Sequence, residues 1–400
     1  MKYVIVLGDG MADEPIEALQ GKTPLEYAQK DMMDSLSKRS EIGLVRTVPK
    51  GMKPGSDTAN LAVLGYDPKK YYTGRSPLEA LSIGVDMEES DVAVRCNIIT
   101  LSEDEDNYED RTIIDHSAGE ISTEESTQLL EAVKNVLEED NYKFYPGTSF
   151  RHLLIWKYGK VVDLAAPHDH LTQKAGPYLP EDDKLREMVL KSYEILKNHP
   201  VNLQRKSQGK RPGNSIWFWG PGTRPVVDSF EAKTGRKGAM ISAVDLLKGI
   251  AVGAQMKNIQ VEGADGSLHT NYEGKAAAAV KTLVEDGSDF AYVHVEAPDE
   301  MGHQGNLHDK IQAIEYLDAR VIRPIYEGLK ASGEDFRMLV LPDHPTPLRL
   351  RTHVGDPVPY MLYDSTNELE KAWCYNEKEA GNSGNYIEDG YTLIDRLFEK

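Results

Sequence analysis

Three short apolar segments of this 400-residue chain each end in a loop that carries an aspartate. The segments and their aspartates are residues 3–7 with Asp9, residues 290–295 with Asp299, and residues 338–341 with Asp343. Short apolar runs bounded by turn residues are typical of buried strands. Ligands of open α/β sheets bind beyond the carboxyl ends of the strands, so we expect the three aspartates at one site.

Helical patterns separate these strands. They cover residues 24–39, 240–251, 275–286 and 308–332. Strands that alternate with helices indicate an α/β fold, in which a mainly parallel sheet carries helices on both faces.

The middle of the chain has a different pattern. Strands are predicted at 92–99 and 152–157, amphipathic helices at 124–138 and 182–198, and Pro- and Gly-rich loops at 205–225. With 40% hydrophobic residues, a chain of this length can form two domains. We therefore predict a smaller α+β domain, residues 90–222, inserted into a core domain of residues 1–89 and 223–400.

Charge and composition exclude several classes of protein. The formal net charge of −19 argues against nucleic acid as a partner, because phosphates would be repelled. An anionic substrate remains compatible, since bound cations can reverse the local field. The start of the chain lacks signal-peptide chemistry, and the apolar segment 240–254 is interrupted by Asp245 and Lys248, so no membrane span is expected. With only two cysteines, the expected location is the cytoplasm. The sequence predicts no oligomeric state.

Acidic and imidazole side chains recur near the predicted strand ends. Asp299 and His303 are four residues apart, so on a helical turn they would point to the same side. Asp343 and His344 follow an apolar strand and precede a proline, and His353 lies in the next loop. Each residue alone also fits an ordinary turn or surface position. Together they offer oxygen and imidazole ligands without thiolate, which favours Mn²⁺ or Zn²⁺ over Mg²⁺.

Ser56 is the predicted nucleophile of such a site. Two ions about 3.5–4 Å apart can clamp the attacking and leaving oxygens of an in-line displacement, and metal coordination activates a serine hydroxyl. Ser56 follows Pro54-Gly55 and precedes a predicted helix, whose first N–H groups would face a phosphate on Ser56. The alternative is that Ser56 is only the N-cap of this helix.

The complete set of motifs resembles the alkaline phosphatase superfamily and, more closely, the archaeal-type cofactor-independent phosphoglycerate mutases. The resemblance covers nearly the whole chain and rests on residues 8–13, 53–60, 74–77 and 298–303, and on Asp343-His344 with His353. It implies an alkaline phosphatase-like core with two metal ions. One ion would be held by Asp9, Ser56, Asp343 and His344, and the other by Asp299, His303 and His353.

The resemblance also implies a reaction. Ser56 would take the phosphoryl group from 3-phosphoglycerate and return it to the other hydroxyl, giving 2-phosphoglycerate in glycolysis or gluconeogenesis. The substrate would be a small phosphorylated metabolite, and no organic cofactor would be needed. The inserted domain is expected to close over the site, because water would hydrolyse the phosphoserine.

One segment departs from the archaeal pattern. Where that group typically has Asp-Arg-Arg-Ala-Gly-Arg, this chain has Asp115-His-Ser-Ala-Gly-Glu120. The loss of three guanidinium groups weakens the case for a phosphate- and carboxylate-bearing substrate. Each basic residue that could substitute also fits an exposed surface charge. These predicted substrate-binding residues are Lys237, Arg75, Arg151, Arg224 and Arg236.

The altered segment favours a second interpretation. A bacterial branch of this group has been proposed to act as homoserine kinase, and His116, Ser117 and Glu120 would suit the ammonium of an amino acid. A kinase would require ATP, yet the sequence contains no Walker-type loop. A phosphatase or phosphodiesterase and a non-catalytic metal-binding protein are further alternatives. The mutase ranks first because its resemblance extends over the full chain.

Overall fold

The computed structural model describes residues 1–399, which form two compact units. The larger unit contains residues 1–72 and 226–399, and the smaller unit contains Thr73–Pro225. Residues 73–89, which the sequence assigns to the core domain, group with the smaller unit. The domain limits at 90 and 222 remain a prediction. No helix within residues 1–399 is long and apolar enough to cross a lipid bilayer.

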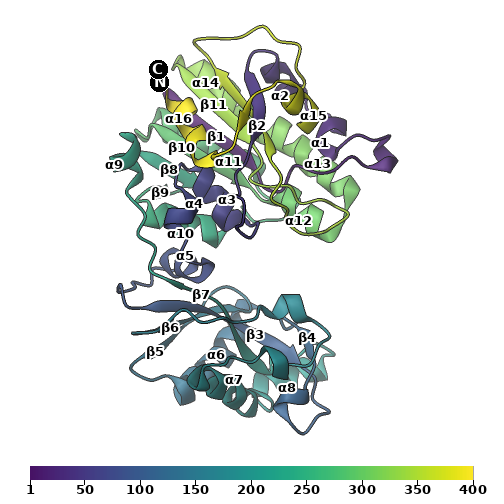
Figure 1. The fold of residues 1–400 in the computed structure, drawn as a ribbon, viewed down its shortest axis with the longest axis vertical. Coiled ribbons are helices and arrows are strands. Elements are labelled where there is room, and N and C mark those ends of the chain that lie inside the picture. The colour runs from purple at the N-terminus through teal and green to yellow at the C-terminus, as the bar shows by residue number, and fades with distance from the viewer. Residues whose placement is uncertain (400) are drawn as a thin grey trace. The chain divides into compact units, whose positions relative to one another are not determined.

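The larger unit is built on an eight-stranded sheet with the strand order β13-β2-β12-β11-β1-β10-β8-β9 (Figure 1). Its strands are β1 (Lys2–Gly8), β2 (Glu41–Val45), β8 (Gly238–Ile241), β9 (Lys257–Asn258), β10 (Phe290–Val295), β11 (Phe336–Leu341), β12 (Val358–Asp364) and β13 (Tyr386–Ile387). Only β12 runs against the others, because its pairs with β11 and β2 are antiparallel and all other pairs are parallel. The predicted α/β fold with a mainly parallel sheet is confirmed.

Helices cover both faces of this sheet. They are α1 (Pro24–Tyr27), α2 (Asp31–Ser37), α3 (Ser56–Val63), α4 (Pro68–Tyr71), α9 (Phe230–Thr234), α10 (Asp245–Gly253), α11 (Tyr272–Val284), α12 (Ala297–Gln304), α13 (Leu307–Leu317), α14 (Arg323–Ser332), α15 (Glu377–Asn382) and α16 (Leu393–Phe398). A π-helical stretch, Asp318–Ile322, joins α13 to α14.

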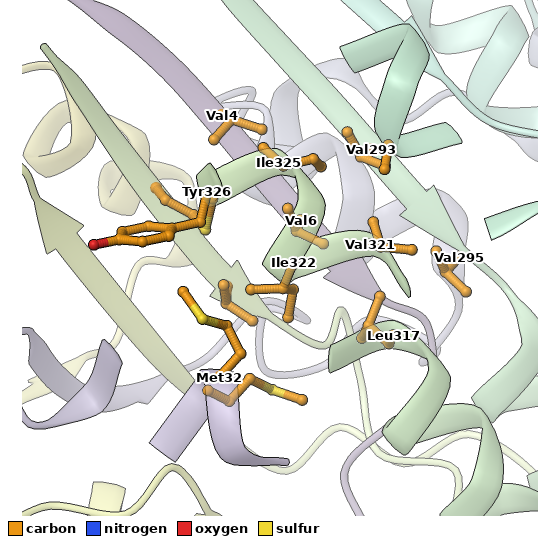
Figure 2. Packing of buried hydrophobic residues seen from close by; sticks show 14 of the residues in the cluster. Val4, Val6, Met32, Val293, Val295, Leu317, Val321, Ile322, Ile325 and Tyr326 are labelled. Atoms are coloured by element: carbon orange, nitrogen blue, oxygen red, sulfur yellow. The ribbon is translucent and has the colours of Figure 1, made fainter. Parts of the chain in front are cut away.

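The alternation of side chains along β1 decides which helices cover each face. Val4 and Val6 point to one face, where they pack against the run from α13 to α14, as Figure 2 shows. On the other face, Tyr3 makes an edge contact with Phe398 of α16. The two apolar layers hold the sheet between the helices and thereby fix the position of its carboxyl edge.

The smaller unit is an antiparallel sheet with helices. Its strands are β3 (Val92–Leu101), β4 (Ile113–Asp115), β5 (Tyr142–Tyr145), β6 (Arg151–Trp156) and β7 (Ser215–Thr223), and its helices are α5 (Arg75–Ser82), α6 (Thr123–Leu137), α7 (Asp183–Leu196) and α8 (Pro200–Ser207). β3 lies between β6 and β7 and also pairs with β4. Most of the buried apolar residues of β3 form one core with α6 and α7, so the predicted α+β character is confirmed.

Two local predictions are wrong. The expected loop at 205–225 contains the end of α8 and all of β7, a strand that pairs with most of β3. The expected helix at 240–251 begins as strand β8, and the helix α10 starts only at Asp245. In both segments an apolar run has no clear period of its own, and pairing with a neighbouring strand decides the conformation.

Candidate active site

The seven predicted ligand side chains come from segments far apart in the sequence, and all belong to the larger unit. Asp9 directly follows β1, and Asp343 follows β11 by two residues. Asp299 lies in α12, which begins two residues after β10. Because β1, β10 and β11 are parallel neighbours, their carboxyl ends bring these aspartates to one edge of the sheet.

Four of the side chains form a buried group around His344. Its Nε2 atom lies 3.1 Å from Ser56 Oγ, 3.5 Å from Asp9 Oδ1 and 3.4 Å from Asp343 Oδ2. Ser56 Oγ also lies 3.4 Å from Asp9 Oδ2. The side chains of Asp343 and His344 are fully buried, so the polar atoms of this group face each other rather than water.

The other three side chains form a second, more open group. His303 Nε2 lies 2.9 Å from His353 Nε2 and 3.2 Å from Asp299 Oδ2. His353 Nε2 lies 3.5 Å from Asp299 Oδ1. The two groups adjoin, since Asp299, His344 and His353 also offer ligand atoms within 4.8 Å of one another. The assignment of four and three ligands to separate ions remains a prediction.

The negative charges of the first group favour the binding of a cation. Burial, together with the carboxylates of Asp343 and Asp299, raises the pKa of Asp9 well above its usual range. Asp9 Oδ1 is buried and has no hydrogen-bond partner among the described residues. An unpaired carboxylate oxygen facing an imidazole nitrogen and a second carboxylate fits a divalent ion, which would pair all three groups.

The pKa of Asp299 shifts in the opposite direction. Burial alone would raise its pKa, but hydrogen bonds from His303 and His353 hold the pKa well below the usual range. The same carboxylate raises the pKa of His303 to about 9. Protonated imidazoles thus compensate the negative charge of the Asp299 carboxylate, as a metal ion would.

Ser56 is not the N-cap of α3. Gly55 occupies the N-cap position, and Ser56 is the first residue of the helix. The Ser56 hydroxyl points to His344 and Asp9 instead of to a backbone N–H group of the helix. The alternative capping role for Ser56 is therefore contradicted, and its Oγ remains available for chemistry.

Sequence reasoning missed the side chains that hold these ligands in place. His294 Nε2 lies 2.8 Å from Asp9 Oδ2, and its Nδ1 faces Ser242 Oγ at 3.2 Å. Burial lowers the pKa of His294 to about 3, so this ring is neutral. The sequence signal for this supporting role was a histidine near the end of the apolar run 290–295, because histidine is uncommon in a fully buried strand.

A second supporting contact starts from Asn60 in α3. Its Nδ2 donates to Asp343 Oδ2 at 2.8 Å and to the Ser56 carbonyl at 2.8 Å. The Tyr292 hydroxyl donates to Asn60 Oδ1 at 2.5 Å, which fixes the orientation of the amide. Asn60 and Tyr292 are fully buried, and this chain of hydrogen bonds orients the Asp343 carboxylate toward the site.

The substrate-binding prediction for Lys237 is wrong. Its carbonyl accepts hydrogen bonds from Asp289 and Phe290 at the beginning of β10, and Lys237 directly precedes β8. β8 and β10 are parallel, so Lys237 lies at the amino edge of the sheet, opposite the edge that carries Asp9 and Asp343.

Apart from Arg236, which belongs to the larger unit, the remaining predicted substrate contacts belong to the smaller unit, and all of them stay predictions. Arg75 pairs with Glu79 inside α5, and Arg224 is exposed beyond β7. Arg151, at the start of β6, lies over the Phe150 ring. His116 is half-buried and Glu120 is exposed.

The segment that departs from the archaeal pattern is a tight turn. The Asp115 carboxylate accepts hydrogen bonds from the backbone of Ser117 and Gly119 and from Arg211. Glu120 has a positive φ of 50° and is exposed. Asp115 thus organises the turn, while His116 makes edge contacts with the rings of Phe150 and His168.

The fold and the two adjoining groups define an α/β protein with a candidate two-metal centre at the carboxyl edge of its parallel sheet. Known proteins of this description resemble the chain closely. The family model for 2,3-bisphosphoglycerate-independent phosphoglycerate mutase matches residues 37–202.

Relatives match over the full length. A protein of Geobacter sulfurreducens, named a probable 2,3-bisphosphoglycerate-independent phosphoglycerate mutase, is 47% identical over 100% of both chains. A mutase of the same name from Methanosarcina barkeri is 48% identical over 95% of both chains. A solved structure of the cofactor-independent phosphoglycerate mutase from Thermoplasma acidophilum has a TM-score of 0.63 and 27% identity, covering 100% of this chain and 99% of the other. The chain belongs to the 2,3-bisphosphoglycerate-independent phosphoglycerate mutase family.

Proposed function

We propose that the protein is a cofactor-independent phosphoglycerate mutase that interconverts 3-phosphoglycerate and 2-phosphoglycerate through a phosphoserine on Ser56. The position of Ser56 carries the proposal. Its Oγ lies among the buried groups of His344 and Asp9 at the first residue of α3. The full-length relatives named as mutases support this choice of reaction.

We further propose that two divalent ions, Mn²⁺ or Zn²⁺, are bound by the seven ligand side chains. When bound, such ions lower the pKa of a coordinated hydroxyl and neutralise the charge of phosphoryl oxygens. The donor set fits this role, because it combines carboxylate and imidazole ligands with one buried, unpaired carboxylate oxygen, Asp9 Oδ1.

The protein's own groups would then divide the reaction into two steps. Ser56 Oγ attacks the phosphorus of 3-phosphoglycerate as the ester bond to the 3-oxygen breaks, so that phosphoserine forms and the serine proton ends on the 3-oxygen of glycerate. Free glycerate turns, its 2-hydroxyl attacks the phosphoserine, and the bond to Ser56 Oγ breaks as that oxygen takes up the proton of the 2-hydroxyl. The N–H groups of Ser56 and Asp57, the first two residues of α3, precede the hydrogen-bonded part of the helix and would stabilise the phosphate on Ser56 during this interval.

The test is an assay of the purified protein with Mn²⁺ and 3-phosphoglycerate. We expect formation of 2-phosphoglycerate, and we expect Ser56→Ala to lower the rate at least ~10³-fold, as loss of a nucleophile does in other enzymes. Ser383→Ala, which removes a hydroxyl at the end of α15, should retain the wild-type rate. Normal turnover by Ser56→Ala would exclude the phosphoserine.

The same preparation discriminates the alternatives. Product formation only from ATP and L-homoserine would favour the kinase, which the altered segment 115–120 suggested. Release of inorganic phosphate alone would favour a phosphatase or phosphodiesterase. For the mutase, a cytoplasmic location without nucleic-acid or membrane partners fits a reaction of glycolysis and gluconeogenesis, and we propose it on that ground.

A further inference from the structure

Thr346 lies between the two groups of candidate metal ligands. Its Oγ1 atom donates a hydrogen bond to Asp299 Oδ1 in the open group. The same atom lies 3.3 Å from His344 Nδ1 in the buried group. The residue is fully buried and is not itself one of the seven ligand side chains.

The directions of these two hydrogen bonds follow from the chemistry of the partners. Asp299 Oδ1 is a carboxylate oxygen and accepts, and the Thr346 hydroxyl donates to it. The hydroxyl proton is thereby engaged in the hydrogen bond to Asp299, so Oγ1 can only accept a hydrogen bond from His344. His344 must then carry its proton on Nδ1, which leaves the lone pair on Nε2, the atom that faces Ser56, Asp9 and Asp343.

The surroundings hold Thr346 in this position. Its carbonyl accepts from Lys310 Nζ at 2.8 Å, and its N–H donates to the Ala12 carbonyl at 3.2 Å. A Cβ atom at Gly10 would come within 2.6 Å of Thr346 Oγ1, and one at Gly302 within 2.8 Å of its carbonyl oxygen. Gly10 thus leaves space for the Thr346 hydroxyl, and Gly302 leaves space for its backbone.

We propose that Thr346 is a positioning residue shared by both metal sites: one hydroxyl fixes the tautomer of His344 and the orientation of Asp299, and so couples the two sites. The inference rests on the metal centre of the proposed function. Partners that orient ligands are typically worth 10–100-fold in metal affinity. Loss of this hydroxyl should therefore weaken both sites together, whereas loss of an ordinary ligand contact should weaken one.

The first experiment measures Mn²⁺ and Zn²⁺ binding to metal-free protein by calorimetry. We expect two ions for the wild type, at least tenfold weaker binding at both sites for Thr346→Val, and recovery to within about threefold for Thr346→Ser, which keeps the hydroxyl. Thr282→Val, which changes a buried threonine of α11, controls for the loss of any buried hydroxyl and should bind both ions normally.

The outcomes separate the two proposals. A wild-type protein that binds no divalent ion would overturn the metal centre itself. Two normal sites in Thr346→Val, or equal losses in the Val and Ser variants, would overturn only the role of Thr346.

A second measurement does not depend on the stability of any Thr346 variant. Histidine-selective ¹⁵N NMR of the metal-free wild type, with the His344 resonance assigned by His344→Gln, should show the Nδ1–H tautomer. The Nε2–H tautomer at His344 would overturn the inference.

Discussion

The Nε2 atoms of His303 and His353 lie 2.9 Å apart, although the residues are separated by 50 positions in the chain. His303 Nδ1 lies 3.0 Å from the Arg351 carbonyl, which can only accept, so this nitrogen carries a proton. Two imidazole nitrogens that face each other at this distance need either a shared proton or a common cation. The arrangement therefore gives the metal-free and metal-bound proteins different responses to pH.

We expect the metal-free protein to lose stability between about pH 6.5 and pH 9. Asp299 raises the folded-state pKa of His303 from 6.5 to about 9, so the contribution of this pair is complete below pH 6.5 and is lost as the pH rises through 9. The measurement is the melting temperature of chelator-treated protein across this range. His303→Gln should show a smaller decrease, and an identical decrease would contradict the assignment. Saturating Mn²⁺ should raise the melting temperature of the wild type at pH 9.

Tyr292→Phe should weaken metal binding without a contact to metal. The variant leaves Asn60 Oδ1 buried and unpaired, which costs about 1–3 kcal/mol of unfolding free energy, and frees the amide that orients Asp343. Chemical unfolding and metal titration measure the two effects. Tyr360→Phe removes a buried hydroxyl that donates to Glu41 and is the matched control. It should lose stability but retain metal affinity, and a loss of affinity in both variants would refute the specific role of Tyr292.

Lys310→Met should destabilise the larger unit strongly. Lys310 Nζ lies 2.7 Å from Asp13 Oδ2, and both side chains are almost completely buried. Removal of one partner of a buried ion pair typically costs about 3–5 kcal/mol, because the other charge remains unpaired. The double variant Lys310→Met with Asp13→Asn should be more stable than the sum of the single changes predicts, by about 1–3 kcal/mol in a double-mutant cycle. Strict additivity would show that the two charges do not interact.

His152 should make the smaller unit sensitive to acid. This β6 side chain is almost fully buried, and burial lowers its pKa to about 3. The unfolded chain binds a proton below pH 6.5 but the folded chain does not until about pH 3, so stability falls as the pH falls through this window, by about 1.4 kcal/mol per pH unit.

Urea unfolding followed by tryptophan fluorescence can detect this effect, because three of the four tryptophans, Trp156, Trp217 and Trp219, belong to the smaller unit. The comparison is His152→Asn, which keeps an acceptor for the Gly147 N–H group but cannot titrate. Its stability should depend less steeply on pH, and an equal dependence would locate the acid sensitivity elsewhere.

Sequence patterns predicted the framework of the site better than its details. The strands that precede Asp9, Asp299 and Asp343 were found because short apolar runs and turn residues are local signals. β7 was missed because Gly220, Pro221 and Gly222 have poor strand propensity, and pairing with β3 overrides it.

The side chains that orient the ligands could not be found in the same way. Thr346 lies between two prolines and Asn60 inside a helix, where each has an ordinary local role. Their function depends on contacts across 47 and 283 positions of the chain, to Asp299 and Asp343 respectively. Only the assembled sheet brings such partners together.

The order of the ligands along the chain has a consequence for biosynthesis. The smaller unit is one continuous stretch, Thr73–Pro225, and can fold on the ribosome while the rest of the chain is still being made. The proposed metal-binding residues run from Asp9 to His353. A nascent polypeptide therefore lacks part of the proposed ligand set until His353 has been translated, so a product that ends earlier would carry Ser56 without the complete site.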